Sequence, residues 1–240
     1  MGLSALSLTA LAKVRNGELS PYGGKSATDE DISTTTHKGK DTMKTKTINC
    51  YQYAELSEKA KEKARDWYRD ASAEDSFWSE SILKDSARIG ESLGIVFDDR
   101  NGKPNIFFSG FSSQGDGACF EGYWSYKRGM VKAIAEDYPK DGELYRIALE
   151  LSKIAQRTFY TVSARVKHSG HYYNSGCMSV DVENEKGPDV EEDITQALRD
   201  FADWIYKSLE SEYDYQNSDS TIAESIEANE YEFDIDWNTI

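Results

Sequence analysis

Two segments with high β-propensity are each interrupted by a short turn of glycine and small polar residues, and this pattern constrains the fold most. The first segment covers residues 105–127 around a turn at 112–117, and the second covers 158–184 around a turn at 169–176. Strands that are joined by such short turns pair antiparallel as hairpins. The sequence therefore predicts an antiparallel β-sheet made of two hairpins.

Helical patterns surround both hairpins. They cover residues 57–71, 76–94, 129–137, 141–154 and 190–209, and a short acidic helix is expected to begin at Thr221. Ser57 and Asp141 are suitable N-caps, and Gly94 suits the left-handed position just after a helix. Helices that alternate with hairpins indicate an α+β fold, in which the antiparallel sheet of two hairpins packs against several α-helices.

The beginning of the chain differs from the rest in composition. Residues 1–42 contain few large apolar side chains, especially between Arg15 and Asp41, so we expect a disordered N-terminal arm. Compact structure is expected from Met43, which is also a candidate for the true start of the protein. Because no later segment has the composition of a linker, residues 43–240 are interpreted as a single α+β domain with acidic C-terminal helices.

Composition points to the cytoplasm of a cell. No stretch approaches the roughly 18 consecutive apolar residues of a membrane helix, and no basic residue precedes Lys13 as in a secretory signal. The three cysteines, Cys50, Cys119 and Cys177, are widely spaced and odd in number, which favours a reducing compartment. We therefore expect a cytoplasmic protein with no membrane partner.

Negative charge is concentrated at the C-terminal end. Residues 181–240 carry 3 basic and 19 acidic side chains, and the whole chain has a formal net charge of −15. This field disfavours direct nucleic-acid binding and favours a protein partner with a basic surface. Asp200, Asp203 and Glu210 are the candidate residues of that surface. The alternative is that the acidic helices only maintain solubility.

The first cluster of candidate binding residues surrounds the first turn. Ser109, Ser113, Gln114, Asp116 and Cys119 lie among glycines that would let a ligand approach the backbone. No nucleotide-binding, metalloprotease or hydrolase motif accompanies them, so the catalytic residues are unknown. The alternative interpretation is that the glycines only form the turn of a hairpin.

The second cluster lies in the second turn and consists of His168, His171 and Cys177. With Cys119 these residues could hold zinc, and a histidine could activate either thiol as a nucleophile. The alternative is a polar aromatic turn with a cysteine packed as a small hydrophobic residue. We predict no metal and no cofactor. Because both turns interrupt strands, we expect residues 109–121 and 168–177 to lie on neighbouring strands and to share one surface.

Several blocks in one order resemble a family of phage and prophage proteins: YQYAELSEKAKEKARDWYR, FSGFSSQGDGACFEG, HSGHYYNSGCMSV, LRDFADWIYKSLESEYDY and IEANEYEF. Some members are labelled as antitoxins of toxin–antitoxin stability systems. The resemblance spans about residues 48–235 and implies a protein of a mobile element. Together with the missing catalytic motifs and the acidic C-terminal segment, it leads us to expect a non-enzymatic binding protein, antitoxin-like or directed at a host factor. The alternatives are a small hydrolase or nucleotide-processing enzyme, or a metal or small-molecule binding module, using residues 109–121 with His168 and His171.

Overall fold

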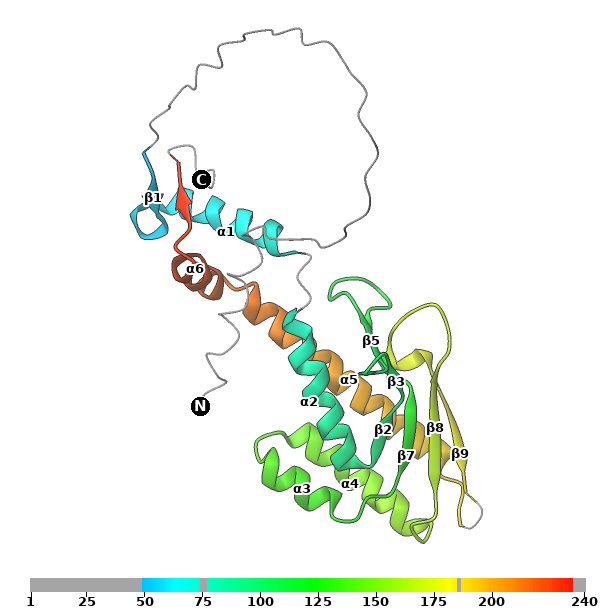
Figure 1. Cartoon of the computed structure of the whole chain (residues 1–240). Helices are drawn as coiled ribbons and strands as arrows, with labels where there is room; N and C mark the ends of the chain where they lie inside the picture. The colour runs from blue at the N-terminus through cyan, green and yellow to red at the C-terminus, as the bar shows by residue number, and fades with distance from the viewer. Residues whose placement is uncertain (1–48, 74–76, 185–186, 235–240) are drawn as a thin grey trace, which may run out of the picture. The chain divides into compact units, whose positions relative to one another are not determined.

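The computed structural model describes residues 49–73, 77–184 and 187–234 (Figure 1). Contacts divide the chain into two compact units, one formed by 1–72 with 219–240 and the other by 73–218. The predicted arm at 1–42 and its boundary at Met43 lie outside the described residues. The expectation of a single α+β domain over 43–240 stays a prediction.

The sheet of the second unit is antiparallel throughout. Its four strands β2 (Ile95–Phe97), β7 (Gly122–Ser125), β8 (Ser163–His168) and β9 (Met178–Glu183) lie in the order β2-β7-β8-β9. Beside them β5 (Ile106–Ser109) pairs with β6 (Gly117–Phe120), and β3 (Asp99–Arg100) pairs with β4 (Lys103–Pro104). Both predicted hairpins are present, as β5–β6 and β8–β9. The α+β prediction is confirmed.

Residues 118–127, expected to form one extended run, are divided at Glu121 into β6 and β7. Glu121 accepts a hydrogen bond from the backbone N–H of His168 at 3.1 Å and another from the side-chain amide of Asn105. The backbone N–H of Glu121 donates to the Asn105 carbonyl oxygen at 2.9 Å. This change of partners lets β6 pair with β5 while β7 pairs with β2 and β8.

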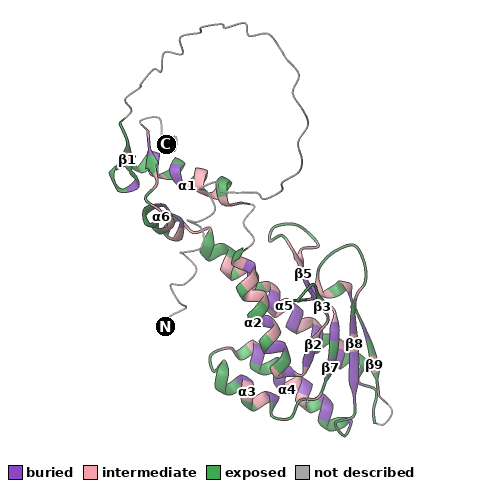
Figure 2. Cartoon of the chain, viewed as in Figure 1, coloured by how far each residue is buried: buried purple, intermediate pink, exposed green. Residues whose placement is uncertain are grey.

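The described part of this unit contains the helices α2 (Phe77–Leu93), α3 (Met130–Asp137), α4 (Gly142–Arg157) and α5 (Glu191–Gln216). They lie on one side of the sheet in Figure 1, and Figure 2 shows buried residues on the surfaces where helices and sheet meet. Trp124 lies fully buried in this core and donates from its indole to the Leu93 carbonyl oxygen at 3.1 Å. Gly94 has the expected left-handed backbone, with φ 86°.

The strand predicted to begin at Thr158 begins five residues later, at Ser163. Thr158 instead ends α4, and its hydroxyl donates to the carbonyl oxygens of Ile154 and Ala155. Phe159 and Tyr160 then take left-handed conformations, with φ 54° and 62°. The hydrogen bonds of the helix end therefore override the β-propensity of these residues.

The first unit joins segments from near both ends of the chain. Strand β1 (Tyr51–Gln52) pairs with β10 (Glu232–Phe233), and the short η2 (Tyr53–Glu55) precedes α1 (Glu58–Ser72). Ser57 caps α1 as predicted, since its hydroxyl accepts from the Ala60 N–H at 3.3 Å. Helix α6 (Asp219–Ala228) begins two residues before Thr221, so the predicted start there is wrong. None of the helices in 49–73, 77–184 and 187–234 is long and apolar enough to cross a membrane.

Candidate functional site

The turn between β5 and β6 lies against the turn between β8 and β9. Asn174 donates from its side-chain amide to the Gly115 carbonyl oxygen at 2.9 Å. A Cβ atom at Gly117 would lie 2.5 Å from the Cβ of Asn174, so this close approach requires glycine. Residues 110–116 and 169–177 therefore form one surface, called the loop surface below. The prediction that the two turns share a surface is confirmed, although their strands belong to different ladders.

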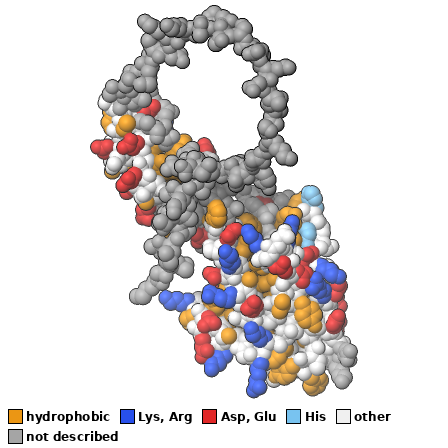
Figure 3. All heavy atoms as spheres, viewed as in Figure 1, with side chains coloured by type: hydrophobic (Ala, Val, Ile, Leu, Met, Phe, Trp, Pro, Cys, Tyr) orange, Lys and Arg blue, Asp and Glu red, His pale blue; other side chains and the backbone are white. Residues whose placement is uncertain are grey.

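Aromatic rings support the second turn from the sheet. Phe107 of β5 stacks on Tyr173 with ring centroids 5.4 Å apart, and the His168 ring lies 5.2 Å from Tyr173. His168 Nε2 is 3.1 Å from the Tyr172 carbonyl oxygen. His171 and Tyr172 are exposed, and histidine side chains lie beside hydrophobic ones at one end of this unit in Figure 3. His168 thus positions the turn, while His171 and Tyr172 face solvent.

Asp116 organises the first turn from within. One of its carboxylate oxygens accepts from the backbone N–H groups of Ser113 at 2.6 Å and Ser112 at 3.0 Å. Ser109 ends β5 opposite Gly117, and Ser113 and Gln114 are exposed. The Asp116 carboxylate therefore fixes the backbone of the turn.

The two cysteines near the turns lie in different environments. Cys119 is fully buried, and burial raises the pKa of its thiol to about 12, with smaller contributions from Cys177 and Glu121. Because the thiolate is the reactive form, this thiol is inert near neutral pH. Cys177 is half-buried in η3 (Ser175–Cys177), where its backbone N–H donates to the Asn174 carbonyl oxygen at 3.0 Å.

The residues of the zinc hypothesis are not assembled as a metal site. Within the described ranges, no three His, Cys, Asp or Glu side chains are grouped so that they could hold a metal ion. His168 instead contacts the Tyr172 carbonyl oxygen and the Phe107 and Tyr173 rings. These contacts favour a structural role for His168.

The other side of the first turn contacts α5. The Tyr206 hydroxyl donates to the Gly110 carbonyl oxygen at 3.0 Å. The Phe111 ring stacks on Tyr206 and Tyr213, with centroid distances of 5.4 and 4.9 Å. Sequence reasoning missed these three residues. The available signal was the seven-residue spacing of the tyrosines, which places them on one face of a helix.

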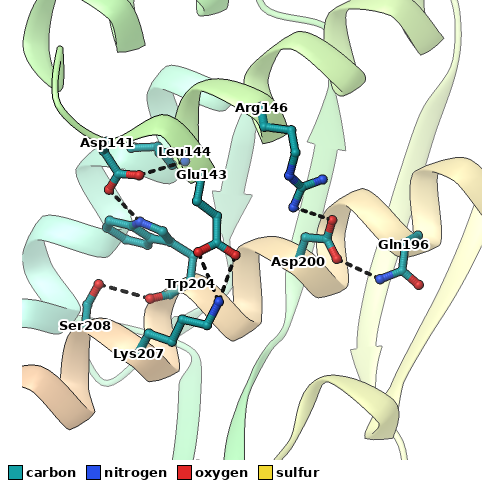
Figure 4. A network of polar contacts seen from close by, with 9 residues as sticks. All are labelled: Asp141, Glu143, Leu144, Arg146, Gln196, Asp200, Trp204, Lys207 and Ser208. Atoms are coloured by element: carbon teal, nitrogen blue, oxygen red, sulfur yellow. Dashed lines mark hydrogen bonds and ion pairs between the residues drawn. The ribbon is translucent and has the colours of Figure 1, made fainter.

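A second polar region lies between α4 and α5, and Figure 4 shows its hydrogen bonds and ion pairs. Asp141 accepts from the Leu144 N–H at 2.8 Å, as the predicted N-cap of α4, and from the Trp204 indole at 2.7 Å. Lys207 donates to both oxygens of Glu143 at 3.0 Å. We call this α4–α5 contact the polar seam. A hollow of about 450 Å³ opens beside it, with Ile154 and Ala197 among its lining residues.

Asp200 belongs to the polar seam and not to an unpaired acidic surface. Its carboxylate accepts from Arg146 at 2.8 Å and from Gln196 at 2.7 Å, and only 18% of its side chain is exposed. The expectation that Asp200 projects freely into solvent is therefore wrong. The cause is Arg146 on α4, which the sequence pattern of α5 alone does not reveal. Asp203 and Glu210 are half-buried, and neither forms an ion pair with any described residue.

The second unit coincides closely with a known sequence family. The model of a family described as a domain of unknown function (DUF8835) matches residues 78–219, and the second unit covers 73–218. No curated protein and no solved structure matches the chain. Because the matched segment is more than half of the 240 residues, the chain belongs to the DUF8835 family.

Proposed function

We propose that the chain is a non-enzymatic binding protein that recognises another protein through the loop surface. The observation that carries this proposal is the hydrogen bond from Asn174 to Gly115, which fixes two turns that are far apart in sequence. Surface turns that are already ordered lose little conformational freedom on binding. The turns thus present His171 and Tyr172 on a prearranged backbone.

The composition of the loop surface supports this role. Residues 110–116 and 169–177 consist mainly of Gly, Ser, Tyr and Asn, with a single Phe at position 111. Antibody loops that bind proteins are enriched in the same residues. Tyrosine gives a large contact area with few rotatable bonds, while Ser, Gly and Asn adapt their hydrogen bonds to the partner. Tyr172, which is 55% exposed, is the anchor that this comparison favours.

We further propose that the partner has a basic surface and is a host factor or a toxin. Glu210 lies on α5 near Tyr206, whose hydroxyl donates to Gly110 of the loop surface, and it forms no ion pair with described residues. Unpaired carboxylates attract a basic protein and speed its association. The resemblance to phage and antitoxin proteins supports a search for the partner in infected or lysogenic cells. A cytoplasmic location is part of this proposal.

The test is partner capture with a matched pair of tyrosine variants. Tyr172→Ala removes the exposed ring of the loop surface, and Tyr145→Ala removes an exposed ring from α4, where it is 42% exposed. Proteins that co-purify with the wild-type chain are identified, and the main one is purified to measure its Kd. We expect Tyr172→Ala to weaken binding at least about tenfold, which corresponds to about 1.4 kcal/mol, and Tyr145→Ala to leave it unchanged.

Equal affinities for the wild-type chain and Tyr172→Ala, with both folded by circular dichroism, would rule out the loop surface as the binding site. His171→Ala serves as a second variant, because His171 is exposed and lies beside Tyr172. A Tyr145→Ala chain that loses binding to the same extent would instead place the interface on α4.

A further inference from the structure

Five aromatic rings form a connected patch beside the loop surface. Phe111 contacts Trp78, Phe108, Tyr206 and Tyr213, with ring centroids 4.9–6.3 Å apart. Trp78 also meets Tyr213 edge-on at 5.8 Å. Tyr213 is 40% exposed, and the other four rings are half-buried. We call this group of Trp78, Phe108, Phe111, Tyr206 and Tyr213 the aromatic patch. Contiguous aromatic surface of this kind commonly marks an interaction site.

Carboxylates give the aromatic patch a negative electrostatic potential. Burial raises the pKa of the Tyr206 hydroxyl, and the negative charges of Glu210 and Asp116 raise it further. Glu210 lies between Tyr206 and Tyr213 on one face of α5, at i+4 from the first and i−3 from the second. Within the described ranges, no Lys or Arg lies over any of the five rings or pairs with Glu210. The patch therefore combines aromatic faces with a carboxylate that has no cation.

The other face of β5 shows such a cation in place. Phe107 and Phe108 are consecutive in β5, so their side chains point to opposite faces. On the Phe107 face, the Arg100 guanidinium lies 5.4 Å from the ring centroid, and Tyr173 stacks on the same ring. Among the residues that the structure describes, the Phe108 face has the aromatic rings and the carboxylate but no arginine. This difference indicates which group would complete the patch.

We propose that the aromatic patch binds an arginine side chain from a peptide segment of the protein partner. A planar guanidinium stacks on aromatic faces and donates hydrogen bonds to a carboxylate at the same time. Lysine carries the same charge but is more strongly hydrated and cannot stack, so arginine is preferred. Glu210 supplies the carboxylate, and Tyr213, the exposed ring of the patch, supplies the ring face. This inference rests on the proposed function and specifies its partner.

The experiment compares two peptides of equal charge on the full chain. Acetyl-GRGRGRG-amide and acetyl-GKGKGKG-amide are titrated in low salt, and binding is followed by the shifts of amide NMR signals. We expect the arginine peptide to bind at least about fivefold tighter, with the largest shifts at the 110–116 turn and around Tyr213. Glu210→Gln and Tyr213→Ala should abolish this preference. Tyr213→Phe should retain it, because the ring remains.

Glu192→Gln is the control for net charge, since it removes one carboxylate from the same helix 18 residues away. It should leave the arginine preference unchanged. If both peptides bound equally, or if Glu192→Gln and Glu210→Gln lost the arginine preference to the same extent, net charge alone would explain the binding and the inference would be overturned. Tyr172→Ala should not alter peptide binding. A failed peptide experiment beside a partner lost in Tyr172→Ala would therefore reject the arginine site and keep the loop surface.

Discussion

Helix α5 carries acidic residues in two environments, which differ in whether a described cation pairs with the carboxylates. In the polar seam, Asp200 pairs with Arg146, and Asp193 pairs with Arg157 on α4. At the aromatic patch, Glu210 lies among rings and pairs with no described cation. The carboxylates are chemically alike, but only one set is neutralised by neighbours. An acidic run in a sequence is therefore not itself a surface, because the facing helix decides which charges remain available.

The largest expected effect is on the polar seam. Replacing Asp141 by alanine removes the N-cap of α4 and leaves the Trp204 indole N–H without its partner. Loss of a cap costs about 1 kcal/mol, and an unpaired half-buried donor adds about as much. We expect the free energy of unfolding to fall by about 2 kcal/mol and Tm to fall by about 4–8 °C, as measured by thermal denaturation. Asp137→Ala on α3 is the control, and an equal fall in that variant would show that the seam has no special role.

The next largest effect is the difference in stability between a variant of the polar seam and a variant of the aromatic patch. Asp200→Asn removes a charge that is 18% exposed and paired, so we expect a loss of about 1 kcal/mol in the free energy of unfolding. Glu210→Gln removes a charge without a cation, so the change should stay within about 0.5 kcal/mol. Urea denaturation measures both. If Glu210→Gln were the more destabilising variant, Glu210 would contribute more to stability than Asp200, which contradicts the comparison.

The smallest effect concerns the pKa of Tyr206. Since Glu210 contributes to raising this pKa, Glu210→Gln should lower it towards the ordinary tyrosine value, while Asp200→Asn should leave it unchanged. NMR titration of chains with ¹³C-labelled tyrosine measures the shift. A pKa raised on folding means that stability falls as pH rises from the unfolded-state pKa through the folded one, and Glu210→Gln should weaken this fall. An unchanged Tyr206 pKa in Glu210→Gln would show that Glu210 does not contribute and that burial and Asp116 set the pKa.

Local patterns predicted much of the fold correctly. Ser57 and Asp141 cap helices, Gly94 ends one, and the two polar turns connect antiparallel strands. These features depend on the chemistry of a few neighbouring residues, so a sequence contains them. The errors at Thr158 and Thr221 also concern helix ends. At Thr158, the hydrogen bonds that end α4 overrode the residue preference, and α6 begins two residues before Thr221.

Only part of the candidate site could be predicted from the sequence, and the reason is physical. The sequence determined that the two turns are polar, rich in glycine and placed between strands, and that α5 is amphipathic and acidic. Only the tertiary structure decided that Asn174 would bond Gly115, that Arg146 would neutralise Asp200, and that Phe111 would lie between Tyr206 and Tyr213. Each of these contacts joins residues far apart in the chain. Their geometry depends on how whole elements pack, and no local pattern encodes that packing.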